Sequence, residues 1–168
     1  MATRAARTEP DRRRPAIPKK TRSDRKQAAR VQYGALPYRI TEAGTLEVLL
    51  ITSRGRRRWI IPKGWPIKGL KPAKSAAREA YEEAGVRGTV STKPIGRFVY
   101  DKILDEDGRA MPCEVVVFGL KVKQQLKTWP EAGERELRWL VPADAEVLTD
   151  EEGLRPLVIA LASKKSPR

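Results

Sequence analysis

Residues 64–86 have the sequence GWPIKGLKPAKSAAREAYEEAGV, and the second half of this stretch decides the fold. It is rich in helix formers and is bounded by Pro72 and Gly85, so we predict a helix over residues 73–84. Three glutamates stand at i, i+3 and i+4 on one face of that helix: Glu79, Glu82 and Glu83. Carboxylates crowded in this way repel one another unless a cation lies among them, and oxygen ligands suit Mg²⁺ or Mn²⁺. The stretch therefore predicts metal-assisted chemistry on a phosphorylated substrate.

Apolar runs on both sides of this helix predict strands. They cover residues 31–40, 46–52, 59–61, 86–99, 111–122 and 137–141, and the run at 46–52 is apolar enough to be buried on both faces. Residues 62–72 predict a loop, because they hold three prolines and two glycines, and residues 105–108 predict a hairpin turn. A short helical turn at 142–147 and an amphipathic helix at 153–163 follow. This order predicts an α/β (α+β) fold in which a mixed sheet is sandwiched between helices.

The first 30 residues differ in composition from the rest of the chain. They hold eleven Lys/Arg and three Asp/Glu, which gives them more than half of the chain's formal charge of +14. They contain almost no large apolar residues, so they cannot bury enough surface to offset the entropy of ordering. We therefore expect a disordered basic N-terminal arm over residues 1–30 and one folded domain over residues 31–168.

Composition also excludes several functional classes. The chain has no histidine, which excludes a Ser-His-Asp triad, a Cys-His pair and any zinc site that needs imidazole. Cys113 is the only cysteine, so no intramolecular disulfide can form, and we expect it to be a small buried hydrophobe. No apolar segment is long enough for a secretory signal or a membrane span. We therefore expect a cytoplasmic protein with no membrane partner.

The glutamate-rich stretch resembles the signature of the Nudix hydrolase family, G-x5-E-x7-R-E-U-x-E-E-x-G-U, in which U is a bulky aliphatic residue. The matching positions are Gly64, Arg78-Glu79, Glu82-Glu83 and Gly85-Val86. Leu70 departs from the signature, because it stands where the family has its first glutamate. That glutamate supports the box in the family, so we expect Leu70→Glu to tighten Mg²⁺ binding. The resemblance covers about residues 31–150 and implies a Nudix-type sheet between helices.

The resemblance also implies the chemistry. Nudix enzymes cleave a diphosphate linked to another group by metal-assisted attack of water on phosphorus. Glu79 and Glu83 would hold Mg²⁺ (or Mn²⁺), and Glu82 would accept the proton of the attacking water. Arg78 can pair with Glu82 at i, i+4 and hold the carboxylates in position.

Motifs on both sides of the box, Arg58-Trp59-Ile60-Ile61-Pro62 and Glu136-Leu137-Arg138-Trp139, follow the order seen in diphosphoinositol polyphosphate and diadenosine polyphosphate phosphohydrolases, and Pro62-Lys63-Gly64 is similar to the latter. We therefore expect a polyanionic substrate of one of these two kinds. Basic residues cluster around the box and could neutralise its phosphates, although any single lysine could equally be a solvated surface residue. Trp65 could stack on a base or a sugar, or pack in the core. The candidate substrate-binding residues are Arg54, Lys63, Gly64, Trp65, Arg109 and Arg135.

The basic arm keeps a second hypothesis open, a nucleic-acid-associated Nudix protein. In it the arm binds RNA or DNA, and the domain is either an RNA 5′-pyrophosphohydrolase or a non-catalytic binder. The arm has no aromatic residue for base stacking and no recognisable nucleic-acid-binding motif. In a third interpretation the arm only aids solubility.

Overall fold

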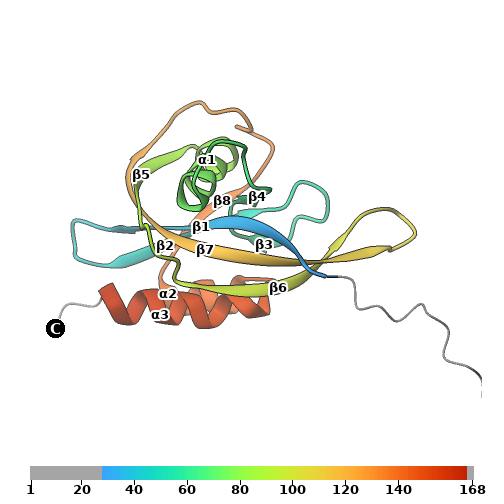
Figure 1. The fold of residues 1–168 in the computed structure, drawn as a ribbon. Helices are drawn as coiled ribbons and strands as arrows, with labels where there is room; N and C mark the ends of the chain where they lie inside the picture. The colour runs from blue at the N-terminus through green and yellow to red at the C-terminus, as the bar shows by residue number, and fades with distance from the viewer. Residues whose placement is uncertain (1–27, 166–168) are drawn as a thin grey trace, which may run out of the picture.

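The computed structural model describes residues 28–165, so most of the predicted arm lies outside the described residues (Figure 1). Arg30, which the sequence placed at the end of the arm, is the first residue of strand β1. Within the described range no helix is long and apolar enough to cross a membrane.

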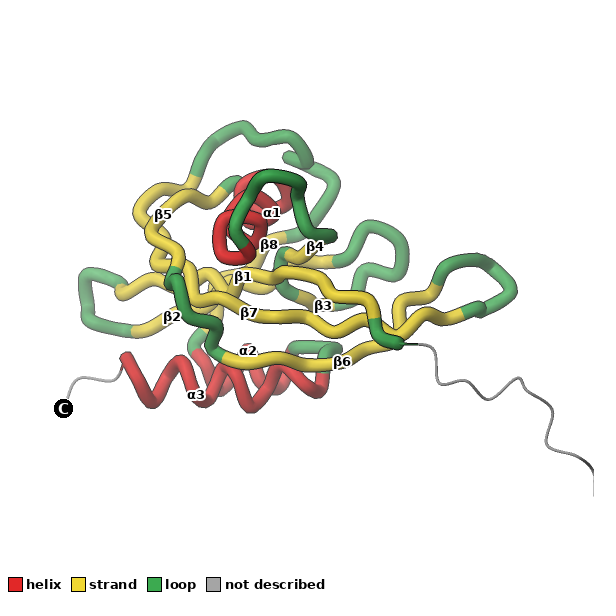
Figure 2. Tube along the Cα trace, viewed as in Figure 1, coloured by secondary structure: helices red, strands yellow, loops and turns green. Residues whose placement is uncertain are grey.

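Eight strands form one mixed sheet in the described part of the chain (Figures 1 and 2). They are β1 (Arg30–Ile40), β2 (Leu46–Thr52), β3 (Trp59–Ile60), β4 (Lys63–Gly64), β5 (Val86–Val90), β6 (Gly96–Ile103), β7 (Ala110–Gln125) and β8 (Leu137–Leu140). The main order is β3-β2-β1-β7-β5, with β4 on β1, β6 on β7 and β8 on β2. The two central strands β1 and β7 are parallel, and every other pair is antiparallel.

Helices cover both faces of this sheet, which confirms the predicted sandwich. Helix α1 (Pro72–Ala84) lies on one face, and α2 (Pro142–Leu148), the 3₁₀ turn η1 (Glu152–Leu154) and α3 (Arg155–Lys165) lie on the other (Figure 1). Strand β2 shows why the sheet is buried on both sides, since four consecutive residues have no exposed surface: Val48, Leu49, Leu50 and Ile51. Val48 and Leu50 join the core under α2 and α3, whereas Leu49 and Ile51 join the core under α1.

Helix α1 is bounded as its sequence predicts. Pro72 is its first residue, and Gly85 ends it with φ of 65°, a left-handed conformation that favours glycine. Three alanines of its inner face have no exposed surface and let the helix lie close to the sheet: Ala76, Ala80 and Ala84. Because this face of α1 packs on the sheet, the position of the helix relative to β4 is fixed, and with it the position of the glutamates.

Two predictions about strands need correction. The single strand over 86–99 is wrong, because β5 ends at Val90 and β6 begins at Gly96. Pro94 in between has no N–H to donate to a ladder, and β5 and β6 pair with successive parts of the 16-residue strand β7. The predicted loop over 62–72 contains a strand, since β4 pairs with Tyr33 and Gly34 of β1.

Candidate active site

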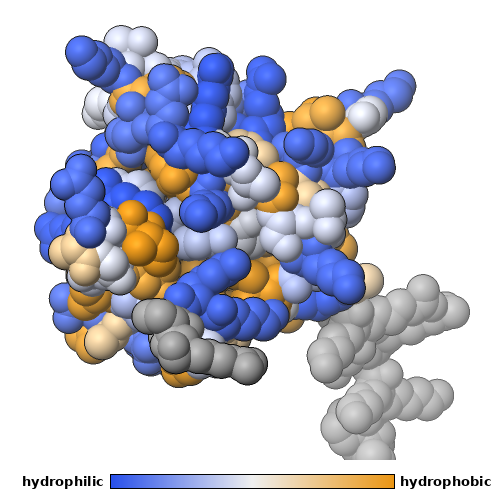
Figure 3. Space-filling view, turned by 90° about the vertical axis from the view of Figure 1, so that its left-hand side faces the viewer, coloured by the Kyte–Doolittle hydropathy of each residue, from blue (hydrophilic) through white to orange (hydrophobic). Residues whose placement is uncertain are grey.

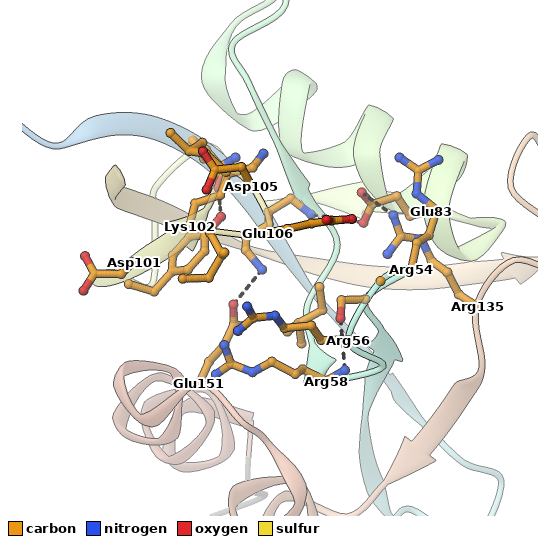
Figure 4. Close-up of a pocket in the computed structure, with 18 residues that line it drawn as sticks. Arg54, Arg56, Arg58, Glu83, Asp101, Lys102, Asp105, Glu106, Arg135 and Glu151 are labelled. Carbon is orange, nitrogen blue, oxygen red and sulfur yellow. Dashed lines mark hydrogen bonds and ion pairs between the residues drawn. The ribbon is translucent and has the colours of Figure 1, made fainter. Parts of the chain in front are cut away.

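A cleft of about 580 Å³ opens where the β2–β3 loop, β4 and the β6–β7 hairpin meet (Figure 4). Its walls carry charges of both signs. Six cationic residues line it: Arg54, Arg56, Arg58, Lys63, Lys102 and Arg135. Five acidic residues also line it: Glu83, Asp101, Asp105, Glu106 and Glu151. The cleft is therefore close to neutral overall and would attract a polyanion only through the particular cations that face it.

Strand β4 lies against two of the three helical glutamates. Gly64 has no side chain because the Glu79 carboxylate occupies that space, and a Cβ there would lie 2.2 Å from Glu79 Oε1. The next residue back, Lys63, donates its backbone N–H to Glu83 Oε2 over 3.4 Å. The signature glycine is thus required by close approach of a carboxylate, which the sequence alone did not predict.

Glu83 is the buried carboxylate of the site and projects into the cleft, where Arg135 Nη2 lies 3.2 Å from its Oε1. Burial raises the pKa of Glu83 to about 7, while Arg135 acts in the opposite direction and Glu79 adds to the increase. The pKa of Glu79 is also raised, first by burial and then by the charges of Glu82 and Glu131. A cation bound between these carboxylates would favour their ionised form and offset the cost of burying their charges.

Glu82 and Arg78 are arranged differently from the other two glutamates. They form the predicted i, i+4 pair, with Arg78 Nε 2.7 Å from Glu82 Oε1, and the Arg78 side chain is 56% exposed. The hydrogen bond and the charge of Glu82 raise the pKa of Arg78 further above its ordinary value. Neither residue is among those that line the cleft. Glu79 does not line the cleft either, so Glu79 and Glu83 are distinguished by their contacts with β4, whereas Glu82 is half-buried and pairs with Arg78.

The donor set fits a hard divalent cation held by two glutamates. Both Glu79 and Glu83 supply oxygen ligands next to the backbone of β4, and Mg²⁺ typically uses one or two carboxylates together with substrate phosphates and water. Within residues 28–165 no group of three His, Cys, Asp or Glu side chains could hold a metal ion. Coordination at Glu79 and Glu83 would therefore have to be completed by the substrate and water.

Glu131 is a further acidic residue of the site, and the sequence analysis missed it. It lies in the loop after β7 that passes over α1 (Figure 2), where its backbone N–H donates to Glu82 O over 3.1 Å. Its negative charge raises the pKa of both Glu79 and Glu83. Trp129 anchors this loop, because its ring packs so tightly on Gly85 that a Cβ at Gly85 would lie 2.4 Å away. No signal short of the tertiary structure could have placed Glu131 here, 48 residues after Glu83.

Arg135 and Arg54 join this loop to the site. The Arg135 side chain is 6% exposed and reaches Glu83 and Glu131, and its Nη1 donates to Thr52 O over 3.0 Å. Arg54, which lines the cleft, has its Nη1 3.1 Å from Glu131 Oε1 and 3.7 Å from Glu134 Oε2, and its side chain is 62% exposed. Arg135 is therefore a buried partner of the carboxylates, whereas Arg54 is an exposed residue of the cleft wall.

The other predicted substrate-binding residues divide into two groups. Lys63 lines the cleft and pairs with Glu151. Trp65 does not line the cleft, but Lys102, which does, lies over its ring at 4.8 Å, and Arg30 lies over the same ring at 4.4 Å. Arg109 instead pairs with Asp105 across the hairpin turn, and its side chain is 79% exposed. Arg109 is not part of the cleft wall.

Leu70, the residue that departs from the signature, lies away from the carboxylates. It is 43% exposed and shares a surface hollow with Lys74 and Arg78. Neither Glu79 nor Glu83 lines that hollow. A glutamate at position 70 would therefore lie next to Lys74 and Arg78 and not next to the carboxylates that would hold a metal.

Two other hollows of the described chain, the one beside Leu70 and a second one, are not lined by the glutamates of α1. The second lies at the end of the molecule that carries the α3 C-terminus, and this end faces the viewer in Figure 3, where hydrophilic side chains surround small apolar patches. No acidic residue lines this hollow, which contains five lysines: Lys93, Lys121, Lys123, Lys164 and Lys165. The cleft beside β4 is thus the candidate for metal-assisted chemistry.

Comparison with known proteins agrees with this geometry. The chain is 35% identical over 130 residues to Nudix hydrolase 12, mitochondrial, of Arabidopsis thaliana, covering 69% of this chain and 64% of that protein. It is 36% identical over 104 residues to diphosphoinositol polyphosphate phosphohydrolase 3-alpha of Mus musculus, covering 59% of this chain and 57% of that protein. The matches thus span less than two thirds of these relatives' own length. Because the plant relative is named mitochondrial, our prediction of a cytoplasmic location stays a prediction.

Solved structures with a similar fold include an Ap4A hydrolase of C. elegans. The C. elegans Ap4A hydrolase structure superimposes with a TM-score of 0.59 at 19% identity, covering 83% of this chain and all of that one. At this identity the likeness supports the fold alone. The model of the NUDIX domain matches residues 32–161, which is most of the chain. The protein therefore belongs to the Nudix hydrolase family.

Proposed function

We propose that this domain is a Mg²⁺-dependent pyrophosphohydrolase that cleaves a phosphoanhydride bond of a polyphosphorylated small molecule. The observation that carries the proposal is the arrangement of Glu79 and Glu83, two buried or half-buried glutamates on the backbone of β4, with Glu83 projecting into a cleft lined by arginine and lysine. Glu79 and Glu83 would hold the metal, for which Mn²⁺ is the alternative ion. When bound, the cation would neutralise the phosphates and lower the pKa of the attacking water.

The protein's own residues have separable tasks in this proposal. Arg135 holds Glu83 in place and lowers the cost of its ionised form. Arg54, Arg56 and Arg58 stand in the β2–β3 loop on one wall of the cleft, where their guanidinium groups can hold phosphate oxygens. Gly64 lets the backbone and the Glu79 carboxylate approach each other closely.

Two glutamates are candidates for the proton acceptor. The family resemblance assigns this role to Glu82, whose charge raises the pKa of Glu79, whereas the charge of Glu131 raises the pKa of both Glu79 and Glu83. Glu82→Gln and Glu131→Gln separate them, since loss of a general base typically costs about 10²- to 10⁴-fold in kcat. We expect one of the two variants to show this loss. If both keep a wild-type kcat, neither is the base.

The relatives and the size of the cleft support the substrate class that we propose. The mouse relative is named for diphosphoinositol polyphosphate and the C. elegans structure for Ap4A, and we propose one of these two classes for this chain. A cleft of about 580 Å³ can hold a drug-sized molecule, which suits either a diphosphoinositol polyphosphate or part of a dinucleoside polyphosphate. The nearly balanced charge of its walls gives no preference by charge alone.

A substrate panel tests the proposal. Diadenosine tetraphosphate, a diphosphoinositol polyphosphate and 5′-triphosphate RNA are incubated with the full chain in Mg²⁺ and in EDTA, and released phosphate or nucleotide is measured. We expect turnover of one of the two small molecules in Mg²⁺ and none in EDTA. Turnover of the RNA alone would favour the nucleic-acid hypothesis, and no metal-dependent turnover of any of them would refute the proposed function.

A further inference from the structure

A buried ion pair joins the cleft to the C-terminal part of the chain. Lys63 Nζ lies 2.6 Å from Glu151 Oε1, and the two side chains are only 7% and 3% exposed (Figure 4). Both residues line the cleft, and the Lys63 ammonium also lies 4.9 Å from the centre of the Tyr100 ring. Glu151 is 88 residues from Lys63 in sequence and belongs to no motif.

The backbone of Lys63 is already fixed without this pair. Strand β4 is hydrogen-bonded to β1 through the register of Lys63 with Gly34 and of Gly64 with Tyr33. The Lys63 N–H also contacts Glu83 Oε2 at 3.4 Å. Only the long side chain of Lys63 is therefore left to be positioned, and Glu151 is its carboxylate partner.

Glu151 is itself held firmly on the other side of the pair. Its backbone N–H donates to Thr149 Oγ1 over 3.1 Å, and its carbonyl accepts the N–H of Leu154 at the end of η1. The neighbouring Asp150 is tied to the edge of the sheet, because Trp59 N–H donates to its Oδ2 over 2.7 Å. The carboxylate therefore stands at a fixed point of the cleft floor.

Stability does not explain such a pair. Taking both charges out of water costs free energy that their attraction seldom exceeds, so well-packed apolar residues are often as stabilising in the same place. The pair is not part of a wider ionic network either, since Glu151 Oε2 is buried and has no hydrogen-bond partner among the described residues. An ammonium group has three donors, and Glu151 uses one, which leaves two for a ligand in the cleft.

We propose that Glu151 is a positioning residue for substrate binding, which fixes the Lys63 ammonium so that its remaining donors face a phosphate of the substrate. This inference rests on the proposed function of the same cleft. A lysine that is already ordered loses little rotamer freedom when the substrate arrives, so the pair strengthens binding and not the chemical step. Glu151 acts through Lys63 and does not touch the reacting atoms.

Two variants test the proposal. Glu151→Gln removes the charge that fixes Lys63, and we expect KM to rise about 10- to 30-fold, the factor that corresponds to the rotamer freedom of a lysine, with kcat within about threefold of wild type. The double variant Lys63→Met/Glu151→Met leaves no unpaired buried charge, so it should unfold at close to the wild-type temperature and still show the raised KM. Glu152→Gln, the same change at the exposed neighbouring residue, serves as the control and should leave KM unchanged.

The outcomes separate this inference from the proposed function. A wild-type KM in the double variant would overturn the inference, because a stable protein without the pair would then bind substrate equally well. If the wild-type protein hydrolyses none of the substrates, the proposed function fails, and Glu151 is then tested by calorimetric binding of diadenosine tetraphosphate in EDTA. There we expect Kd to rise about 10- to 30-fold in Glu151→Gln and by at least that factor in the double variant, which also lacks the Lys63 donors, and an unchanged Kd in either variant would refute the positioning role.

Discussion

Gly64→Ala is predicted to disable the site while leaving the fold intact. The added Cβ would lie 2.2 Å from Glu79 Oε1, 2.4 Å from Cδ and 2.8 Å from Oε2, so the whole carboxylate must withdraw. An ordinary van der Waals separation is about 3.5 Å, which requires a displacement of roughly 1 Å or more. Misplacement of a catalytic group by about 1 Å can cost on the order of 10²-fold in rate, and we expect a loss of that size in kcat/KM.

The assay compares Mg²⁺-dependent turnover and thermal unfolding of the same protein samples. Gly64 is not in the left-handed region, so alanine should fit the backbone, and we expect the unfolding temperature to change by only a few degrees. Gly55→Ala is the matched control, since nothing lies within 4 Å of a Cβ at that position. Wild-type kcat/KM in Gly64→Ala would refute the reasoning that the Glu79 carboxylate must lie against β4.

Four further predictions concern Glu83, Arg135 and Leu70. Because burial raises the pKa of Glu83 to about 7, Mg²⁺ must displace a proton from this carboxylate below that pH. The Mg²⁺ affinity measured by calorimetry should therefore rise up to about tenfold per pH unit from pH 5.5 and level off above 7. An affinity that does not change with pH would contradict the account. Between about pH 4.5 and 7, Glu83 keeps its proton in the folded state and has lost it in the unfolded state. The contribution of Glu83 to the free energy of unfolding should therefore decrease as pH rises through this range. Arg135→Gln leaves the buried Glu83 unpaired and should lower the free energy of unfolding in urea by about 3 kcal/mol, whereas an unchanged midpoint would show that the ion pair is dispensable. Leu70→Glu should change Mg²⁺ affinity by less than about threefold, since position 70 lies beside Lys74 and Arg78; the tighter binding expected from the signature would show that the glutamate reaches the metal instead.

Local sequence signals predicted the fold well where a single element carries them. Pro72 and Gly85 mark the ends of α1, and the apolar run of β2 is buried on both faces. The strand break between Val90 and Gly96 was not predicted, because it depends on how two strands share the edge of β7. Strand β4 is only two residues long and exists because β1 lies beside it, so no periodicity could reveal it.

The candidate site was predicted only in part, for the same reason. Spacing within one helix placed Glu79 and Glu83 near each other, and it also gave the Arg78–Glu82 pair. It could not show that Glu79 and Glu83 lie against the two residues of β4. The pairs that complete the site, Arg135 with Glu83 and Lys63 with Glu151, join residues far apart in sequence, so their contact depends on the tertiary fold.

The most direct test of the central claim is the Mg²⁺-dependent turnover of Glu83→Gln. This change keeps the size of the side chain and removes the carboxylate that projects into the cleft beside β4. Glu42→Gln, at an exposed turn residue, is the control. We predict that the wild type and Glu42→Gln hydrolyse the preferred substrate in Mg²⁺ and not in EDTA, and that Glu83→Gln loses at least about 10²-fold in kcat while it stays folded. Turnover at the wild-type rate in Glu83→Gln would contradict the account.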